Sequence, residues 1–157
     1  MGDEMDVAAV TALIQRYADA IDTGDLDGLA NLFTAGVLRS PRGAAHGRDE
    51  VRALYDAVVL DEHGLPGTHH MVFDIDVTVD GDRARSTSYV AVVQGGMPIV
   101  AGRYHDSFVR DGGQWRFDER VIYLDLIGDM SNHFRMPQSR REHPSAARGA
   151  NEGEQHG

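Results

Sequence analysis

Residues 71–94 read MVFDIDVTVDGDRARSTSYVAVVQ, and this stretch decides the fold. From Met71 to Val79 every second residue is apolar, which is the two-residue period of a strand. Asp80 and Gly81 then form a dipeptide that is typical of a two-residue hairpin turn. We therefore expect a long strand that ends near Val79 and turns back into an antiparallel strand over residues 83–94.

The same succession of strand and turn continues toward the C-terminus. Glycine-containing turns at residues 95–98 and 111–113 separate a strand reaching about Arg110 from a last strand over residues 114–125. Strands that are joined by such short turns pair antiparallel. The second half of the chain is thus predicted to be one antiparallel meander.

The first half of the chain has helical periods instead. Apolar residues recur three and four positions apart over residues 7–21, and Gly24 ends this pattern. Asp25 is a typical cap for a second, shorter helix, and a third helix is predicted to start near Asp49. Residues 37–38 are expected to begin a short strand, and residues 41–47 to form a loop. These elements predict an α+β domain in which about three N-terminal helices close the concave face of a curved, mainly antiparallel sheet.

Composition narrows the classes of function. The 157 residues suffice for one domain with its own core, contain no cysteine and no lysine, and carry a formal net charge of −10. Thiol nucleophiles, Schiff bases and a phosphate-loop lysine are therefore excluded. An acidic chain repels nucleic acid and anionic membrane, and no apolar run approaches the roughly 20 residues of a membrane span. With an acidic start unlike a secretory signal, we expect a cytoplasmic protein that binds neither nucleic acid nor membrane.

Residues 135–157 differ in composition from the rest of the chain. They are polar, contain Gly, Glu, Ser and Pro, and have almost no apolar side chains. Such a segment cannot bury enough apolar surface to pack. We expect a single domain over residues 5–134, followed by a disordered polar tail over residues 135–157.

Six short motifs are spread over the predicted elements. They are Tyr17 with Asp22 and Gly24-Asp25, His46-Gly47-Arg48-Asp49, Thr68-His69-His70, Asp80-Gly81-Asp82-Arg83-Ala84, Gly102-Arg103-Tyr104-His105-Asp106, and Gly113-Gln114-Trp115-Arg116-Phe117. In this order they resemble the SnoaL-like family of the nuclear-transport-factor-2-like superfamily, over about residues 5–134. The resemblance implies a cone-shaped α+β barrel, in which a strongly bent sheet wraps around helices and leaves a hydrophobic cavity at its open end.

The resemblance also implies which side chains act. Tyr17 and Asp22 match the tyrosine and aspartate that dehydratases of the superfamily place at the pocket, and His70 matches the acid/base histidine of dehydratase and cyclase members. Asp106 falls on the strand where SnoaL-like cyclases carry an acid. Ketosteroid isomerase chemistry is disfavoured, because its proton-shuttling aspartate would fall at Ser40.

The residues themselves leave open which of two adjacent histidines faces the cavity. An imidazole titrates near neutral pH and suits proton transfer, and Asp22 would orient that of His70. Strict alternation, however, groups His69 with Met71 and Phe73 and puts His70 on the opposite face, unless a bulge intervenes. A hydrogen-bonded histidine without a catalytic role is the alternative.

Further polar residues complete the candidate site. Tyr17 would donate a hydrogen bond to a substrate carbonyl or oxyanion, or would only pack in the core. Asp106 is the fourth candidate catalytic residue, although the burial argument favours a structural ion pair with Arg120. The residues predicted to bind substrate are His69, Tyr55, Tyr104 and Arg120.

The predicted function is a cyclase or dehydratase that acts on a hydrophobic, oxygenated small molecule of polyketide, terpenoid or steroid type. Its general acid/base catalysis would need no cofactor, and epoxide opening is a less favoured variant. We expect no metal site, because adjacent strand residues point to opposite faces and no ligand spacing repeats.

The alternative prediction is a non-catalytic ligand-binding or dimerisation domain on the same fold. In both cases we expect a homodimer that forms through the sheet. The apolar patch predicted for this contact consists of Val90, Val92, Ile99 and Val100.

Overall fold

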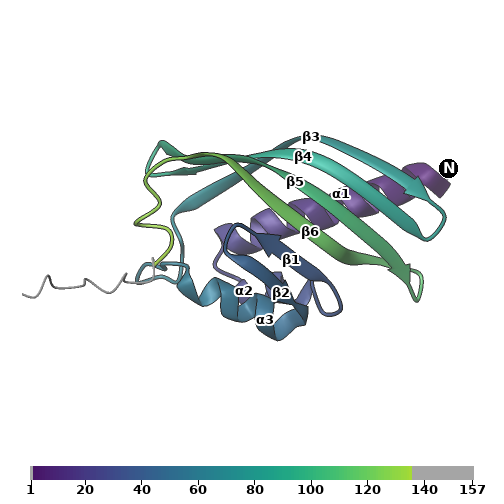
Figure 1. Cartoon of the computed structure of the whole chain (residues 1–157), viewed down its shortest axis with the longest axis horizontal. Helices are drawn as coiled ribbons and strands as arrows, with labels where there is room; N and C mark the ends of the chain where they lie inside the picture. Colours follow the sequence, from purple (N-terminus) through teal and green to yellow (C-terminus); the bar gives the residue numbers. More distant parts are fainter. Residues whose placement is uncertain (1, 136–157) are drawn as a thin grey trace, which may run out of the picture.

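A six-stranded sheet curves around one long helix in the computed structural model, which describes residues 2–135 (Figure 1). The helices are α1 (Gly2–Asp22), α2 (Leu26–Asn31) and α3 (Gly47–Leu54), and a short 3₁₀ turn, η1 (Tyr55–Ala57), follows α3. The strands are β1 (Val37–Ser40), β2 (Gly43–His46), β3 (Thr68–Asp80), β4 (Arg83–Gln94), β5 (Met97–Asp111) and β6 (Gln114–Ile127). The predicted α+β class is confirmed.

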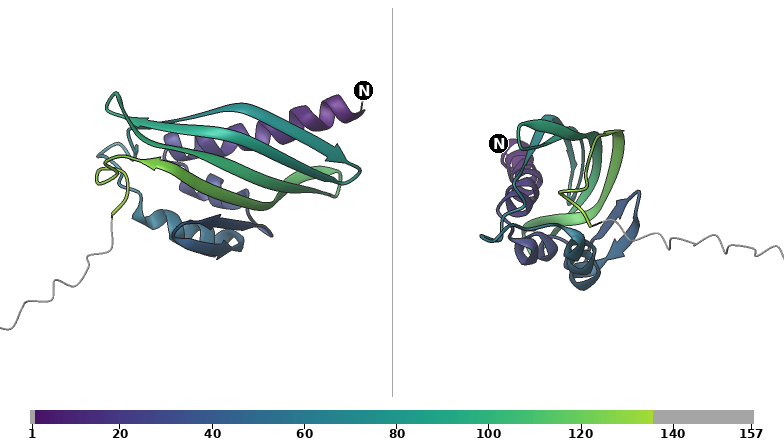
Figure 2. Two further views of the ribbon diagram at one scale, coloured as in Figure 1. Left: turned by 45° about the horizontal axis from the view of Figure 1, so that its top comes forward. Right: turned by 90° about the vertical axis from the view of Figure 1, so that its left-hand side faces the viewer.

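The sheet order is β2-β1-β6-β5-β4-β3, and all neighbours pair antiparallel except β1 and β6, which are parallel. The predicted meander therefore forms as β3 to β6, and β4 begins and ends at the predicted residues. Figure 2 shows that the sheet bends so that α1 and α2 lie on its concave side. The core between them includes Phe33, Phe108 and Phe117, whose rings pack within 5 Å of one another in two pairs.

A bulge in β3 decides which of its side chains face inward. Phe73 pairs with Tyr89 and Asp76 with Thr87, so β3 has one residue more than β4 between these pairs. Asp74 is at this bulge and has a φ of 50°. This is the left-handed region, in which Asp is one of the few side chains that are tolerated. Prediction from uninterrupted alternation is wrong here, because the bulge reverses the phase between the two halves of the strand.

The end of α1 is fixed by a close approach of two backbone segments. Gly24 has a φ of 74°, and a Cβ built there would lie 2.0 Å from the carbonyl oxygen of Gly64. Only glycine fits this position. Asp25 then caps α2 by accepting a hydrogen bond from the Gly28 backbone N–H at 2.8 Å. The turn leaves Asp22, the last residue of α1, next to the start of β3.

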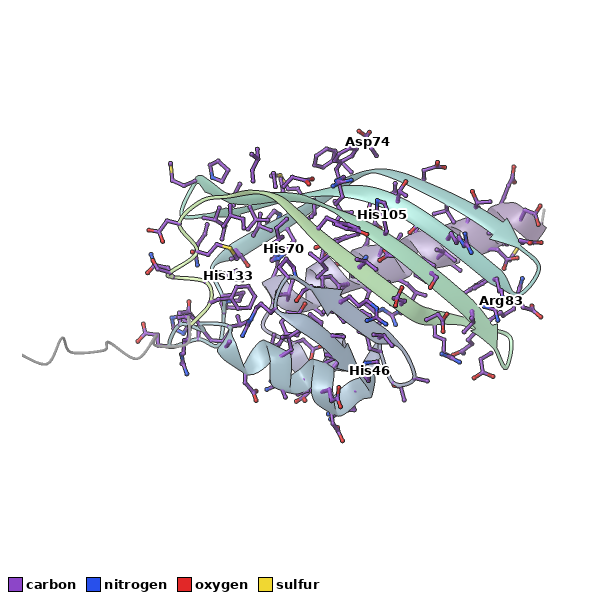
Figure 3. The ribbon with its side chains drawn as sticks, viewed as in Figure 1. His46, His70, Asp74, Arg83, His105 and His133 are labelled. Atoms are coloured by element: carbon purple, nitrogen blue, oxygen red, sulfur yellow. The ribbon has the colours of Figure 1, made fainter. Side chains whose placement is uncertain are left out.

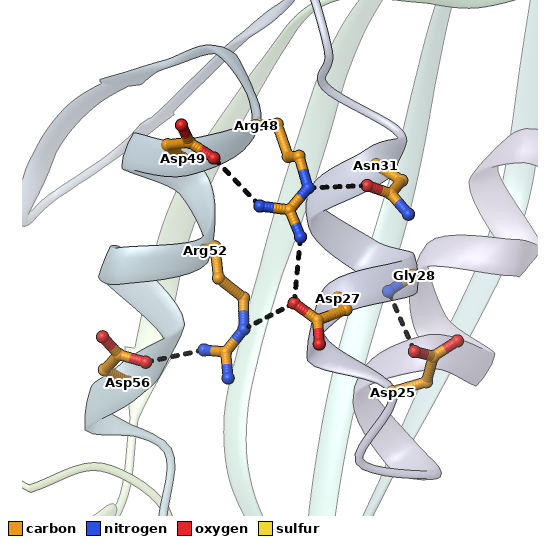
Figure 4. A network of polar contacts seen from close by, with 8 residues as sticks. All are labelled: Asp25, Asp27, Gly28, Asn31, Arg48, Asp49, Arg52 and Asp56. Atoms are coloured by element: carbon orange, nitrogen blue, oxygen red, sulfur yellow. Dashed lines mark hydrogen bonds and ion pairs between the residues drawn. The ribbon is translucent and has the colours of Figure 1, made fainter.

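Two arginines of α3 hold it against α2 (Figure 4). Asp27 Oδ1 accepts hydrogen bonds from Arg48 and Arg52 at 3.2 Å each, and Arg48 also donates to Asn31 at 2.9 Å. Exposed ion pairs of this kind contribute less than about 1 kcal/mol each. Their structural consequence is that α3, and the Tyr55 that follows it, have a defined place relative to α2.

The short β2 was not expected. Residues 43–46 lie in the predicted loop, but they form a strand that pairs with β1 from Val37↔His46 to Ser40↔Gly43. The sequence Gly-Ala-Ala-His has low strand propensity, so pairing with the available edge of β1 determines this element. The third helix also begins earlier than predicted, at Gly47, and gives way to η1 after Leu54.

The apolar patch predicted for a homodimer is wrong in its residues. Val90, Val92, Ile99 and Val100 are only 2–6% exposed, because their side chains point into the interior. Exposed apolar side chains of the outer face come instead from Met71, Phe73, Tyr89 and Tyr123. The homodimer itself stays a prediction.

Two further predictions concern the chain outside the sheet. No helix within residues 2–135 is long and apolar enough to cross a bilayer. The predicted tail over residues 135–157 lies outside the described residues except for Arg135.

Candidate active site

Asp22 and His70 form a hydrogen-bonded pair where α1 meets β3. Asp22 Oδ1 lies 2.6 Å from Nδ1 of His70, and Oδ2 accepts a hydrogen bond from the His70 backbone N–H at 2.7 Å. The hydroxyl of Thr68 donates to Oδ1 at 3.1 Å. These contacts fix the carboxylate at the helix end, and the carboxylate in turn fixes the orientation of the imidazole.

The charge of Asp22 determines what the ring can do. Burial raises the pKa of Asp22, but hydrogen bonds from the His70 ring, the His70 backbone and Thr68 outweigh it and hold this pKa below its ordinary value. Asp22 is therefore a carboxylate at neutral pH, and it favours the tautomer with hydrogen on Nδ1 of His70. The neutral ring then has its lone pair on Nε2, where it can accept a proton.

His70 borders a cavity of about 790 Å³. Its walls come from α1, η1, the inner face of the sheet and the segment that follows β6. Most of the wall is apolar and includes Val90, Val92, Val100, Ile122 and Leu124. Figure 3 shows His70 between the sheet and the helices, whereas Asp74 lies on the outer side of the sheet. A mostly apolar cavity of this size with few polar groups suits a small hydrophobic molecule.

Three tyrosines supply hydroxyl groups to the same cavity. Tyr17, Tyr55 and Tyr104 all line it, and the hydroxyls of Tyr17 and Tyr55 hydrogen-bond to each other. Burial raises the pKa of each of the three phenols above its ordinary value. All three stay protonated at neutral pH. In a pair of hydroxyls only one hydrogen is used between them, so the pair retains a donor for a ligand oxygen.

Asp106 and Arg120 form a second pair, which is completely buried. Arg120 donates to the two carboxylate oxygens at 2.8 and 2.7 Å, and both side chains are 0% exposed. The guanidinium carbon lies 3.9 Å from the ring centroid of Tyr104 and 4.3 Å from that of Tyr17. Burial lowers the pKa of Arg120, but the charge and hydrogen bonds of Asp106 outweigh this effect and hold the pKa above its ordinary value. The guanidinium therefore keeps its charge. The Arg120 guanidinium of this pair packs against the rings of Tyr17 and Tyr104.

The structure separates the predicted site residues into two groups. Tyr17, Tyr55, His70 and Tyr104 line the cavity, and Asp22 lies directly behind His70. Asp106 and Arg120 do not line it, so the structural interpretation fits them better than a catalytic or substrate-binding one. His69 is on the outer face with its side chain 76% exposed, and it reaches only to 3.9 Å from Asp22. The bulge in β3 is the reason that His70, and not His69, faces inward.

One cavity residue had no signal in the sequence. His133 lies beyond β6, in a segment without strand or helix period, yet it is only 2% exposed and lines the same cavity. Its ring centroid is 5.9 Å from that of His70 (Figure 3). Only the return of the chain over the open end of the cone brings it there.

Other polar clusters lack these features. A more open hollow of about 480 Å³ lies over β3 to β6 and is lined by polar residues such as Arg85, His105 and Glu119. Within residues 2–135, no group of three His, Asp or Glu side chains is arranged to hold a metal ion. The apolar cavity with the Asp22–His70 pair is therefore the candidate active site.

The fold and the cavity define a cone-shaped α+β protein with an acid/base pair inside. The model of the SnoaL-like domain matches residues 5–121, and the chain belongs to this family. A search of curated proteins found no match.

Solved structures of the same fold come from several bacteria. A protein of unknown function from Mycobacterium tuberculosis has 27% identity and a TM-score of 0.70, over 80% of this chain and 75% of its own. An NTF2-like protein with a cystatin-like fold from Novosphingobium aromaticivorans has 27% identity and a TM-score of 0.66, over 80% and 84%. A putative scytalone dehydratase from the same bacterium has 23% identity and a TM-score of 0.67, over 82% and 91%. These likenesses establish the nuclear-transport-factor-2-like fold.

Proposed function

We propose that the protein is a cofactor-free lyase or isomerase of the dehydratase or cyclase type. Its substrate is a small hydrophobic molecule with oxygen functions, of polyketide, terpenoid or steroid type. The observation that carries the proposal is the Asp22–His70 pair at the wall of an apolar cavity that protonated tyrosines also line. A purely hydrocarbon cavity, with the imidazole pointing away, would favour binding alone.

In the proposed reaction His70 is the general base. Its Nε2 removes a proton from the carbon next to a substrate carbonyl, and Asp22 stabilises the imidazolium that forms. A hydroxyl of the Tyr17–Tyr55 pair donates a hydrogen bond to the carbonyl oxygen, on which negative charge develops. In a dehydration, the enolate expels a hydroxyl group from the next carbon by breaking that C–O bond, and the imidazolium returns its proton to this group, so that water leaves. In a cyclisation, the enolate carbon attacks a second carbonyl of the substrate instead, and the imidazolium protonates the alkoxide that forms. The tyrosines stay neutral throughout.

Exchange of carbon-bound hydrogen for deuterium tests the first step without knowledge of the natural substrate. α-Tetralone, a bicyclic aromatic ketone, is incubated with the protein in D₂O, and deuterium at the carbon beside the carbonyl is measured by NMR. We expect the protein to accelerate exchange over buffer, and His70→Ala to lose about 10²- to 10⁴-fold of this acceleration.

His69→Ala is the matched control, because it removes an adjacent imidazole that lies outside the cavity. We expect it to exchange like the wild-type protein. Tight binding of α-tetralone without accelerated exchange would contradict the proposal and favour the non-catalytic ligand-binding domain. Mass spectrometry of β-hydroxy ketones, with loss of water as the readout, then distinguishes dehydration from enolisation alone.

A further inference from the structure

The segment after β6, residues 128–135, crosses the open end of the cone and lines the cavity (Figure 1). It is attached to the 3₁₀ turn and its neighbours by backbone bonds, since Val59 N–H donates to the His133 carbonyl and Arg135 N–H to the Ala57 carbonyl, both at 2.8 Å. Phe134 forms an isolated bridge with Val58. None of these contacts uses the His133 side chain. The segment should therefore keep its place when that side chain is changed.

The His133 imidazole has unused hydrogen-bonding capacity. Its Nδ1 is enclosed by protein atoms and has no hydrogen-bond partner among residues 2–135, which leaves Nε2 as the ring nitrogen that a ligand can reach. A buried polar atom without a partner costs about 1–3 kcal/mol. Such a group is rarely retained in a core without a reason, and here the ring borders the cavity beside His70.

The protonation state of His133 limits its role. Burial lowers the pKa of His133 to about 4, and the positive charge of protonated His70 lowers it too, against a small opposing effect of Asp22. The ring is therefore neutral at pH 7, with one nitrogen that donates and one that accepts. A neutral imidazole suits a hydroxyl group, which can both donate and accept.

We propose that His133 is a substrate-binding residue, whose imidazole hydrogen-bonds a hydroxyl group of the molecule on which His70 acts. This inference rests on the proposed function for the role of His70. The segment after β6 is then a part of the active site and contacts the substrate. The cavity then selects molecules with an oxygen function near its open end, in addition to the one held by the tyrosines.

A pair of probes tests this contact by binding alone. The dissociation constants of α-tetralone and of its hydroxyl-bearing derivatives are measured by calorimetry or fluorescence. We expect the best hydroxylated probe to bind roughly fivefold tighter than the parent ketone, as one net hydrogen bond allows. His133→Phe, which keeps an aromatic ring, should abolish this ratio while the parent ketone binds as before. His133→Asn, which keeps a donor and an acceptor, should restore part of it.

His105→Phe is the control, because it makes the same substitution at a histidine of the outer sheet face. The expected result is an unchanged ratio. A ratio that survives His133→Phe, a wild-type protein without any preference, or equal weakening of both probes would overturn the inference, since equal weakening indicates a structural role only. An NMR titration of ¹⁵N-labelled histidine gives a second readout: the His133 signals should move with the hydroxylated probe more than with the parent ketone.

The two proposals fail in distinguishable ways. The binding ratio requires no turnover, so its loss in His133→Phe supports the contact even if no deuterium exchange occurs. Suppose that deuterium exchange depends on His70, but the ratio of the two dissociation constants is the same in His133→Phe as in the wild-type protein. This result would support the catalytic proposal and overturn the proposal for His133.

Discussion

Two acid–base pairs, Asp106–Arg120 and Asp22–His70, differ in what surrounds them. Asp106–Arg120 is completely buried, and three aromatic rings pack around its guanidinium. Asp22–His70 lies at the cavity wall, where Nε2 of the ring is left for a ligand. The comparison teaches that pairing alone does not mark a catalytic group. A pair becomes useful for proton transfer when one member is an imidazole that reaches the cavity.

Breaking the buried Asp106–Arg120 pair should have the largest effect on stability. Arg120→Met leaves the Asp106 carboxylate in the core without its partner, and we expect a loss of about 3–5 kcal/mol in the free energy of unfolding. Urea titration followed by circular dichroism measures it. The double variant with Asp106→Leu should recover much of the loss, because it removes the unpaired charge. An unchanged urea midpoint in Arg120→Met would show that the pair contributes nothing.

Breaking the pair at the cavity should act on the reaction instead. Asp22→Asn keeps the size of the side chain but removes the charge that stabilises the imidazolium, so deuterium exchange should fall about 10²-fold. The free energy of unfolding should fall by only about 1–2 kcal/mol, as hydrogen bonds to Thr68 and His70 weaken. Asp25→Asn is the control in the same turn, because Asn caps a helix as well as Asp does. Equal rates in the two variants would contradict the role of Asp22.

The loss of stability at acid pH should also depend on this cavity, because His133 is a third titratable group that lines it. Its pKa is about 4 in the folded protein and about 6.5 when unfolded, so the unfolded chain binds the proton first. Its contribution is fully present above pH 6.5 and is lost as the pH falls toward 4, by at most about 3 kcal/mol. Between pH 7 and pH 4 the free energy of unfolding should therefore fall less in His133→Asn than in the wild-type protein. Parallel pH profiles for the two proteins would refute a buried, neutral His133.

The smallest expected effect concerns the hydroxyl pair of Tyr17 and Tyr55 at the cavity. Tyr55→Phe removes the hydroxyl that bonds to Tyr17, and we expect a loss of about 1 kcal/mol in stability and roughly tenfold in exchange rate. Tyr123→Phe on the outer face should change neither quantity. If exchange in Tyr55→Phe matched the wild-type rate, Tyr17 alone would suffice to polarise the carbonyl.

Local patterns in the sequence were enough for most of the elements that hold the site. The hairpin at Asp80-Gly81, the cap at Asp25 and the turn at Gly24 depend on backbone preferences of a few residues, and they form where these residues predict. Tyr17 and Asp22 lie where a helix ending before Gly24 must place them.

What the sequence could not supply depends on contacts between distant segments. One error has a different cause: Arg83 and Arg85 mark the outer face of β4, and the same alternation places Val90 and Val92 on the inner face, so the predicted apolar patch was assigned to the wrong face. β2 exists because β1 offers an edge, and His133 reaches the cavity because its segment bonds to residues 57–59. Both facts are tertiary, with no period or motif to predict them.

The bulge at Asp74 has a consequence for how such a site changes during evolution. Three residues separate it from His70, yet it determines which of two neighbouring positions, 69 or 70, points its side chain into the cavity. A lineage whose strand became regular while keeping its length would present position 69 to the cavity, with Ile75 and Val77 still in the core. Deletion of Asp74 would instead remove the bulge and leave position 70 in place. Because this chain has histidine at both positions, an imidazole faces the cavity after either event.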